Sequence, residues 1–319
     1  MPQPTRRALL ASPALLLPAV ARAQPFPDRP MRMIVPFPPG GAADFLGRVA
    51  AEPMAKTLGQ PIAVENRTGA GGNIGTAVAA QAEKDGHSIL LNGLPYAANR
   101  FLYASLPYDP DQDFTPLAML AVVPNIMVVS KDLPVRNVAE FVALAKAKGA
   151  HYASIGNGTS LHLAGAQFTL AAGLDMTHVP YRETAAANSD VMSGRVEVMF
   201  QTISAAAGLV KGGRMKALAV TSAERVPAFP EVPTLREAGM DLVSVGWFGL
   251  FAPRGVPEDR VTRLEAATIA AVNDPAVNAR ILETGSLPRP LPGAGFARFI
   301  AGESARMGAT IRAAGIRAD

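Results

Sequence analysis

Residues 31–44 read Met31-Arg32-Met33-Ile34-Val35-Pro36-Phe37-Pro38-Pro39-Gly40-Gly41-Ala42-Ala43-Asp44, an apolar strand that runs into a Pro/Gly turn and a helix start. Beyond the turn, apolar residues recur at three- and four-residue steps through Leu58, which predicts a helix whose first N–H groups face the end of the strand. Gly40 and Gly41 leave that end uncovered, and the helix dipole adds about half a positive charge there. The turn suits a carboxylate or phosphate without any lysine or arginine, although an ordinary strand-to-helix turn has the same residues.

A second glycine-rich turn repeats this arrangement in the middle of the chain. It reads Ser154-Ile155-Gly156-Asn157-Gly158-Thr159-Ser160-Leu161-His162 and lies between a predicted strand and a predicted helix. Thr159 and Ser160 add hydroxyl groups to the backbone donors, as expected where an oxyanion is held, but a Ser or Thr here also makes an ordinary N-cap. Two such turns at the carboxyl ends of strands favour a ligand cleft between them.

Short β-branched runs alternate with Ala- and Leu-rich helical patterns, which predicts an α/β fold with mainly parallel sheets. The predicted strands are 31–37, 61–66, 88–92, 125–130, 151–154, 176–179, 196–200 and 215–221. The predicted helices are 44–58, 73–83, 137–148, 160–172, 185–193, 205–211, 258–273 and 294–313. Pro-rich stretches at Leu133-Pro134 and 227–233 bracket a central block that predicts an inserted second lobe, with a hinge and a cleft between the lobes.

The first residues predict an export signal. Arg6 and Arg7 precede an apolar run that is shorter than the roughly 20 residues of a membrane-spanning helix. Ala21-Arg22-Ala23 has the form that signal peptidase cuts, which predicts cleavage near Ala23 and a periplasmic protein, with the Sec or twin-arginine route left open. Removing residues 1–23 takes away three arginines and lowers the formal net charge from +4 to +1.

Composition and motifs argue against several classes of function. A nearly neutral mature chain without a Lys/Arg stripe gives little support for binding nucleic acid or a membrane surface. The chain has 0 cysteines, and its 4 histidines lack metal-ligand spacing, so neither a metal nor a cofactor is expected. The glycine-rich segment 66–75 lacks both the P-loop ending and the dinucleotide spacing, so it predicts a tight turn before a helix. No Gly-x-Ser-x-Gly nucleophile elbow is present.

A further candidate lies at Tyr181-Arg182-Glu183-Thr184, another strand-to-helix junction. Arg182 is suited to a bidentate pair with a ligand carboxylate. The alternative is an exposed Arg182 beside Glu183, a contact worth under about 1 kcal/mol.

From Phe26 to about Ile311 the chain resembles the extracytoplasmic solute receptors of the tripartite tricarboxylate transporter family, the Bug or TctC-like proteins. The matching segments are 30–41 with Asp44, 64–67, 69–75, 106–110, 113–114, 156–160, 162–165, 178–181 and 247–253. The resemblance implies a type II periplasmic-binding-protein fold of two Rossmann-like lobes joined by a hinge. Lobe 1 would comprise 24–125 and 240–319, and lobe 2 would comprise 126–239. It also implies no catalysis, and a small organic acid held between the two turns for the permease subunits of a tripartite tricarboxylate-type transporter.

The predicted ligand contacts are Phe37, Pro38, Pro39, Gly40, Gly41, Ala42, Asp44, Gly93, Gly156, Asn157, Gly158, Thr159, Ser160, His162, Tyr181, Arg182 and Gln201. Three departures from the family pattern leave the ligand class open. Ala42-Ala43 stands where many members carry Ser or Thr, Arg182-Glu183 replaces a usual Lys-Gly, and Gln201 stands where members often have an acid. The alternatives are an uncharged or zwitterionic ligand, a receptor that signals to a membrane sensor and, more remotely, an exported enzyme on the same scaffold. A monomer is expected.

Overall fold

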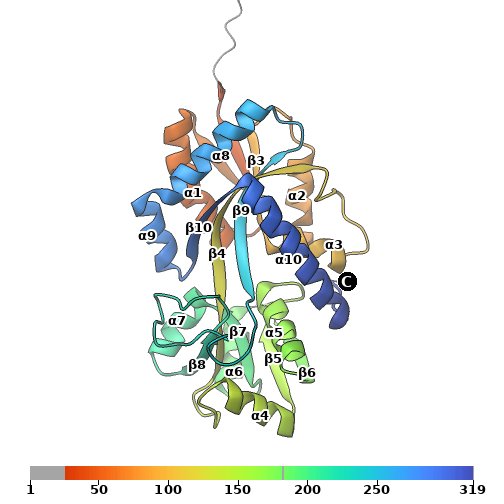
Figure 1. Cartoon of the computed structure of the whole chain (residues 1–319), viewed down its shortest axis with the longest axis vertical. Coiled ribbons are helices and arrows are strands. Elements are labelled where there is room, and N and C mark those ends of the chain that lie inside the picture. Colours follow the sequence, from red (N-terminus) through yellow and green to blue (C-terminus); the bar gives the residue numbers. More distant parts are fainter. Residues whose placement is uncertain (1–25, 182, 319) are drawn as a thin grey trace, which may run out of the picture.

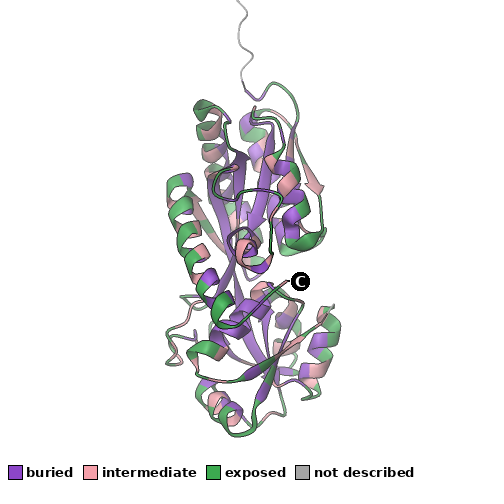
Figure 2. Cartoon of the chain, turned by 90° about the vertical axis from the view of Figure 1, so that its right-hand side faces the viewer, coloured by how far each residue is buried: buried purple, intermediate pink, exposed green. Residues whose placement is uncertain are grey.

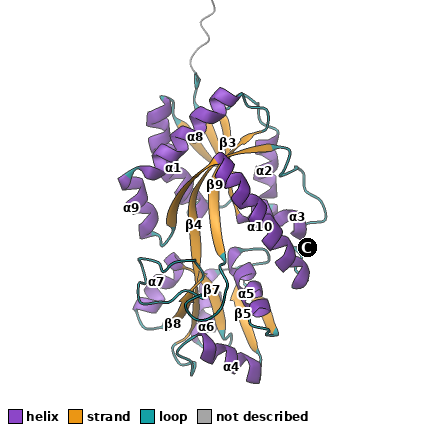
Figure 3. Cartoon of the chain, in the orientation of Figure 1, coloured by secondary structure: helices purple, strands orange, loops and turns teal. Residues whose placement is uncertain are grey.

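The computed structural model describes residues 26–181 and 183–318 (Figure 1). The predicted export signal, residues 1–23, and Arg182 lie outside the described residues. The molecule is elongated, with helices packed around strands in both its upper and lower halves (Figure 3). Within the described ranges, no helix has the length and apolar character needed to cross a membrane.

The upper half contains strands in the order β2–β1–β3–β9–β4, with β10 also paired to β4. These strands are β1 (Met31–Val35), β2 (Ile62–Asn66), β3 (Ser88–Gly93), β4 (Phe114–Ser130), β9 (Val245–Pro253) and β10 (Leu287–Pro292). One face packs against α1 (Ala42–Leu58), α8 (Glu258–Asn273) and α9 (Pro275–Glu283). The other packs against α2 (Asn73–Ala80), which follows the short η1 (Ala70–Gly72), and against α3 (Leu94–Leu102) and α10 (Gly293–Ala313). Met33 and Ile34 are buried on opposite faces, as a strand covered on both sides requires.

The lower half contains β5 (Ala150–Ser154), β6 (Met176–Pro180), β7 (Val198–Thr202) and β8 (Met215–Val220), together with the end of β4. α4 (Val138–Lys148) and α5 (Ser160–Ala171) cover one face through Phe141 and Phe168. α6 (Thr184–Met192) and α7 (Ile203–Lys211) cover the other through Ala187 and Ala206. In both halves the central strands are buried, whereas β2, β6 and β10 are only partly buried and the outward faces of the helices are exposed (Figure 2).

β4 joins the two halves as one strand of 17 residues. Residues 114–124 pair with β9, and residues 125–129 pair with β7 (Figure 1). The chain returns to the upper half between β8 and β9. The boundary expected at residue 125 lies inside β4, and the division into lobes at 24–125, 126–239 and 240–319 stays a prediction.

Strand pairing is mixed, which corrects the expectation of mainly parallel sheets. Parallel pairs join β1 to β2 and β3, and join β5 to β6 and β7. The pairs made by β4 and β9 are antiparallel. The reason is topological, since a chain that leaves one half and later returns passes between them in opposite directions.

Most elements predicted from the sequence are confirmed with ends that differ by up to three residues. The structure adds α3, α9, β9 and β10, and it extends β4 back to Phe114. β10 contains Pro288, Pro290 and Pro292, which hide a strand pattern because proline cannot donate to a sheet. α7 begins at Ile203, two residues before the expected start, and this difference affects the candidate site.

Candidate ligand-binding site

Two cavities are each lined by part of the first predicted turn. The α7 cavity has a volume of about 460 Å³ and is lined by Gly40, Gly41, Ala42, Phe45, Val123, Thr184, Thr202, Ile203, Ser204, Ala205, Thr284 and Ser286. The α5 cavity has a volume of about 250 Å³ and is lined by Pro36, Phe37, Pro38, Thr68, Gly69, Gly71, Gly72, Pro95, Asn99, Leu102, Tyr103, Asn157, Gly158, Thr159 and Ala318. Both cavities draw residues from the upper and the lower half of the molecule.

The start of α1 forms one wall of the α7 cavity. Gly40 has φ +79°, a left-handed conformation that favours glycine, and it turns the chain from strand to helix. Gly41 is the N-cap without a side-chain cap bond, and its carbonyl accepts the hydrogen bond of the Phe45 N–H at 3.0 Å. The N–H groups of Ala42 and Ala43 therefore precede the helical hydrogen-bond ladder. They are backbone donors at the positive end of a helix of 17 residues.

The start of α7 forms the opposing wall. Thr202 is the N-cap, again without a side-chain cap bond, and the next residues line the cavity through Ala205. Thr184, the first residue of α6, lines the same cavity. Three helix N-termini thus meet here, each carrying roughly half a positive charge.

The side chains of the α7 cavity add hydroxyl groups but no charge. The hydroxyl groups belong to Thr184, Thr202, Ser204, Thr284 and Ser286. Among the described residues that line this cavity, none is a lysine, an arginine or a carboxylate. A negatively charged group would therefore meet uncharged donors and helix dipoles.

Asp44 holds the turn before α1 in shape. Its buried carboxylate accepts hydrogen bonds, each of 3.0 Å, from the Gly40 N–H, the Arg48 Nε and the Asn66 Nδ2. The hydrogen bond from Arg48, with those from Gly40 and Asn66, lowers the pKa of the Asp44 carboxyl despite its burial. Asp44 lines neither cavity, so its contacts are those of a positioning residue for the turn.

Gln201 holds the start of α7 in a similar way. It is 1% exposed, and its Oε1 accepts hydrogen bonds from the Thr202 N–H at 2.8 Å and the Thr202 hydroxyl at 3.3 Å. Its Nε2 donates to Asn188 Oδ1 at 3.2 Å. Gln201 does not line the cavity but lies behind its wall. Because its side chain is neutral, it adds no negative charge that would offset the partial positive charge at the N-terminus of α7.

The second predicted turn faces the first across the α5 cavity, where its residues lie opposite Phe37 and Pro38. The Thr159 hydroxyl donates to the Gly156 carbonyl at 2.8 Å and accepts from the His162 N–H at 3.3 Å. Thr159 is therefore the N-cap of α5, one of the two roles left open by the sequence. The donors of this turn mainly satisfy the turn itself.

The other groups of this turn are also engaged. The Gly156 N–H donates to Ser154 Oγ at 3.1 Å, and the Gly158 N–H donates to His162 Nδ1 at 3.1 Å. Asn157 Nδ2 donates to the Arg317 carbonyl at 3.2 Å. Gly158 has φ +75°, and a Cβ there would lie 2.6 Å from Leu102 Cδ1 of the upper half. The halves approach closely at this point.

His162 lies outside the α5 and α7 cavities. It packs in a stack of aromatic rings beside a third cavity of about 570 Å³, which it lines together with Asn157 and C-terminal residues such as Gly315. Its ring lies 3.8 Å from that of His178, with an interplanar angle of 7°, and Tyr152 stacks beside both. Burial, with a smaller contribution from His178, lowers the pKa of His162 to about 3. Burial also lowers the pKa of His178 to about 4. Both rings are neutral at neutral pH, so His162 accepts a hydrogen bond from the turn and supplies no positive charge.

The remaining predicted contacts are dispersed. Gly93 is the N-cap of α3, where a Cβ would collide with the Trp247 carbonyl, and the Tyr181 hydroxyl donates to Asp190 Oδ2 at 2.8 Å. Neither residue lines the α5 or the α7 cavity. Pro39 is exposed between residues that line different cavities. The Ser160 carbonyl accepts from Asn125 Nδ2 at 3.2 Å, where β4 passes between the halves.

The residues at the start of α7 that line the cavity were not among the predicted ligand contacts. Thr202 and Ser204 stand between a predicted strand and a predicted helix, which is the same signal that singled out the second turn. Thr284 and Ser286 follow α9, a helix that was not predicted, and no motif marks them.

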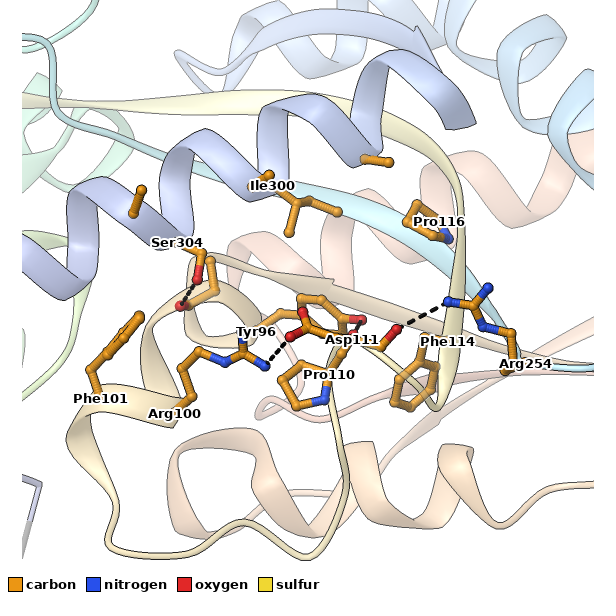
Figure 4. A pocket seen from close by; sticks show the side chains of 14 residues that line it. Tyr96, Arg100, Phe101, Pro110, Asp111, Phe114, Pro116, Arg254, Ile300 and Ser304 are labelled. Atoms are coloured by element: carbon orange, nitrogen blue, oxygen red, sulfur yellow. Dashed lines mark hydrogen bonds and ion pairs between the residues drawn. The ribbon is translucent and has the colours of Figure 1, made fainter.

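A further cavity of about 430 Å³ lies in the upper half between α3, the start of β4 and α10 (Figure 4). Its polar side chains bond to neighbouring groups. Arg100 pairs with the Asp111 carboxylate at 2.7 Å, Arg254 donates to the Asp111 carbonyl at 3.0 Å, and Ser304 donates to the Ala97 carbonyl at 3.3 Å. None of the predicted contacts lines this cavity, so it is not part of the candidate site.

The chain is similar to known proteins in both sequence and fold. A family model described as "Tripartite tricarboxylate transporter family receptor" matches residues 46–316. The protein BugT of Bordetella pertussis is 33% identical over 94% of this chain and 93% of its own length. A solved structure of a Rhodopseudomonas palustris protein with adipate has 32% identity and a TM-score of 0.80, covering 92% of this chain and 99% of that one. MatC from Rhodopseudomonas palustris with bound malate has 34% identity and a TM-score of 0.75, covering 90% of this chain and 100% of that one.

Proposed function

The chain belongs to the tripartite tricarboxylate transporter receptor family, and we propose that it captures a small carboxylate in the α7 cavity. It has the α/β periplasmic-binding-protein fold, and it is a periplasmic solute-binding receptor rather than an enzyme. Two structural relatives hold adipate and malate, which supports a carboxylate as the solute. The proposed export signal, cleaved near Ala23, would deliver the chain to the periplasm. We propose that the mature protein is a monomer.

One observation carries this proposal: the N-termini of α1, α6 and α7 converge on a cavity that lies between the two halves. Each N-terminus offers N–H groups that have no partner inside the helix. The hydroxyl groups of Thr184, Ser204 and Ser286 can complete the hydrogen bonds of a carboxylate, whereas those of Thr202 and Thr284 donate to Gln201 and to the Ile281 carbonyl. No carboxylate of the described chain lines the cavity, so a ligand ammonium group would find no counter-charge there. This favours an anion over the zwitterionic alternative.

Hydrogen bonds and apolar contacts in the α7 cavity can together account for micromolar binding of a carboxylate. Three or four charge-assisted hydrogen bonds, each worth about 1.5–3 kcal/mol, contribute roughly 5–12 kcal/mol before costs. Association costs at least about 4 kcal/mol. Micromolar binding corresponds to about −8 kcal/mol, so apolar contacts with Phe45 and Val123 would supply the difference.

We further propose that the loaded receptor delivers its solute to the permease subunits of a tripartite tricarboxylate-type transporter. The family assignment supports this partner, and the two-lobed arrangement suits closure on a small solute. A receptor that signals to a membrane sensor would use the same cavity. Pull-down of permease or sensor subunits, with and without solute, distinguishes the two roles.

Calorimetry tests the proposal with protein that has been unfolded, dialysed and refolded to remove bound solute. Adipate and malate are titrated beside their diamides, which keep the shape and lose the charge. Gly41→Val should weaken carboxylate binding at least about tenfold, because its side chain would occupy the space beside the α1 N-terminus. Gly41 has an ordinary φ of −82°, and a Cβ there lies 3.6 Å from its nearest neighbour, so the fold should tolerate the change.

Gly302→Val is the matched control, because a Cβ at Gly302 on α10 meets nothing within 4 Å and the residue is exposed. It should bind as the wild type does. Carboxylate binding that survives Gly41→Val unchanged would place the solute elsewhere. Equal binding of the acids and the diamides would overturn the anion assignment.

A further inference from the structure

We propose that Arg280 recognises a second anionic group of the solute at the mouth of the α7 cavity. This inference rests on the proposed function and extends it to a specificity-determining residue. The inner wall of the cavity offers only uncharged donors. A solute with two separated carboxylates would place one against the helix N-termini and the other against this guanidinium.

The position of Arg280 follows from two neighbours that line the cavity. Its guanidinium carbon lies 6.0 Å from the ring centroid of Phe45, a cation–π contact. Thr284 follows Arg280 by four residues at the end of α9, and residues four apart share a helix face. Phe45 and Thr284 both line the α7 cavity, so Arg280 stands on the side of α9 that faces it.

The positive charge of Arg280 is also available to bind a solute carboxylate. The side chain is exposed, and within residues 26–181 and 183–318 no carboxylate forms an ion pair with it. Glu283 lies three residues further along α9, and these two side chains make no ion pair in the described chain. By contrast, Arg48 at the other end of the turn is already paired with Asp44 at 3.0 Å. A solute that binds Arg280 would therefore displace no existing partner.

The chemistry of the two subsites differs in a way that creates selectivity. Backbone N–H groups and hydroxyls bind a carboxylate wherever its oxygens fit. An arginine adds a planar fork that matches a carboxylate bidentately, and the guanidinium of Arg280 lies against the ring of Phe45, which lines the cavity. A dianion gains both contacts, whereas a monoanion gains only the first. Arg280 should therefore affect the binding of dianions and leave monoanions nearly unchanged.

Calorimetry with paired solutes tests this inference on the full mature chain. Adipate is compared with hexanoate, and malate with 2-hydroxybutyrate, because each second compound replaces one carboxylate by a methyl group. Arg280→Gln should weaken dianion binding about three- to tenfold and should reduce its dependence on ionic strength. Monoanion binding should stay within a factor of about two. Arg280→Lys keeps the charge without the fork and should give an intermediate loss.

Arg263→Gln is the matched control, since Arg263 is an exposed arginine of α8 that lines neither cleft cavity. It should bind both classes as the wild type does. If Arg280→Gln binds adipate and malate like the wild type, or weakens both classes equally, the assignment of Arg280 is overturned while the proposed function stands. If the wild type binds none of the four acids, the proposed function fails, and the inference fails with it.

Discussion

At the scale of single residues, the turns at 40–42 and 156–159 differ in which of their hydrogen-bond donors already have partners. The Pro/Gly pattern at Gly40, Gly41 and Ala42 predicts backbone donors at a helix start, and these residues line the α7 cavity. The second turn has the same pattern, yet the hydroxyl of Thr159 caps α5 and Gly158 donates to His162. A sequence reveals that a turn can hold an anion. It does not reveal which turns the packing of two lobes will leave with free donors.

The stacked pair of His162 and His178 predicts a pH-dependent stability. Both pKa values lie below the ordinary 6.5, at about 3 and about 4. Between pH 6.5 and 4.5 these two histidines are therefore mostly protonated in the unfolded chain and mostly neutral in the folded chain. The free energy of unfolding decreases as the pH falls. The free energy of unfolding should decline by about 1–2 kcal/mol per pH unit in this window.

Urea unfolding at several pH values measures this slope. His178→Gln removes one of the two titrating rings and should reduce the slope by about half. The window ends at pH 4.5 because carboxyl groups with lowered pKa, such as that of Asp44, lose their contribution at lower pH. A slope that is the same in the variant and the wild type would refute the assignment to the stacked pair.

At the scale of elements, α1 contains two acid–base pairs at the same spacing with different roles. Asp44 pairs with Arg48 and also accepts the Gly40 N–H, whereas Glu52 pairs with Lys56 on an exposed surface. Asp44→Ala should cost about 2–3 kcal/mol of stability, because it removes a buried carboxylate that accepts charge-assisted hydrogen bonds from Gly40, Arg48 and Asn66. Glu52→Ala should cost less than about 0.5 kcal/mol.

Urea midpoints and carboxylate titrations of the two variants provide the check. Asp44→Ala should also weaken solute binding, since the carboxylate shapes the turn that lines the cavity. Equal stability losses in the two variants would show that Asp44 acts as a surface ion pair only.

The elements that sequence analysis missed have physical reasons. β10 is interrupted by prolines, and α3 and α9 are helices of 9 residues, shorter than the window of roughly 11–18 residues in which helical periodicity is recognised. The first part of β4 is almost fully buried, so it lacks the polar alternation that marks a strand. α9 matters for function, because it carries Arg280 and leads to Thr284 and Ser286 at the cavity.

At the scale of the whole molecule, the two halves are joined by more than the crossing strand β4. Gln167 of α5 accepts from Arg306 of α10 at 2.9 Å and donates to Thr310 at 3.3 Å. Leu163 of α5 is buried in the same apolar cluster as Met307 of α10. The sequence predicted two lobes from its Pro-rich brackets, but it carried no sign that α10 would pack against the central block.

The C-terminal residues distinguish the two cleft cavities. The Ala318 N–H donates to the Leu102 carbonyl at 3.2 Å in the upper half, and Asn157 of the lower half donates to the Arg317 carbonyl at 3.2 Å. Ala318 lines the α5 cavity, while no residue beyond Ser286 lines the α7 cavity in the described chain. Arg317 and Ala318 thus connect the two halves beside the α5 cavity, and Ala318 occupies part of its wall. The α7 cavity has no such connection in its described lining, which favours it as the place for a solute.

A crystal structure of the protein with adipate or malate would show where the solute binds. We expect a solute carboxylate in the α7 cavity, with its oxygens about 2.7–3.2 Å from N–H groups at the starts of both α1 and α7. A solute seated in the α5 cavity, or one that touches neither helix start, would contradict this expectation.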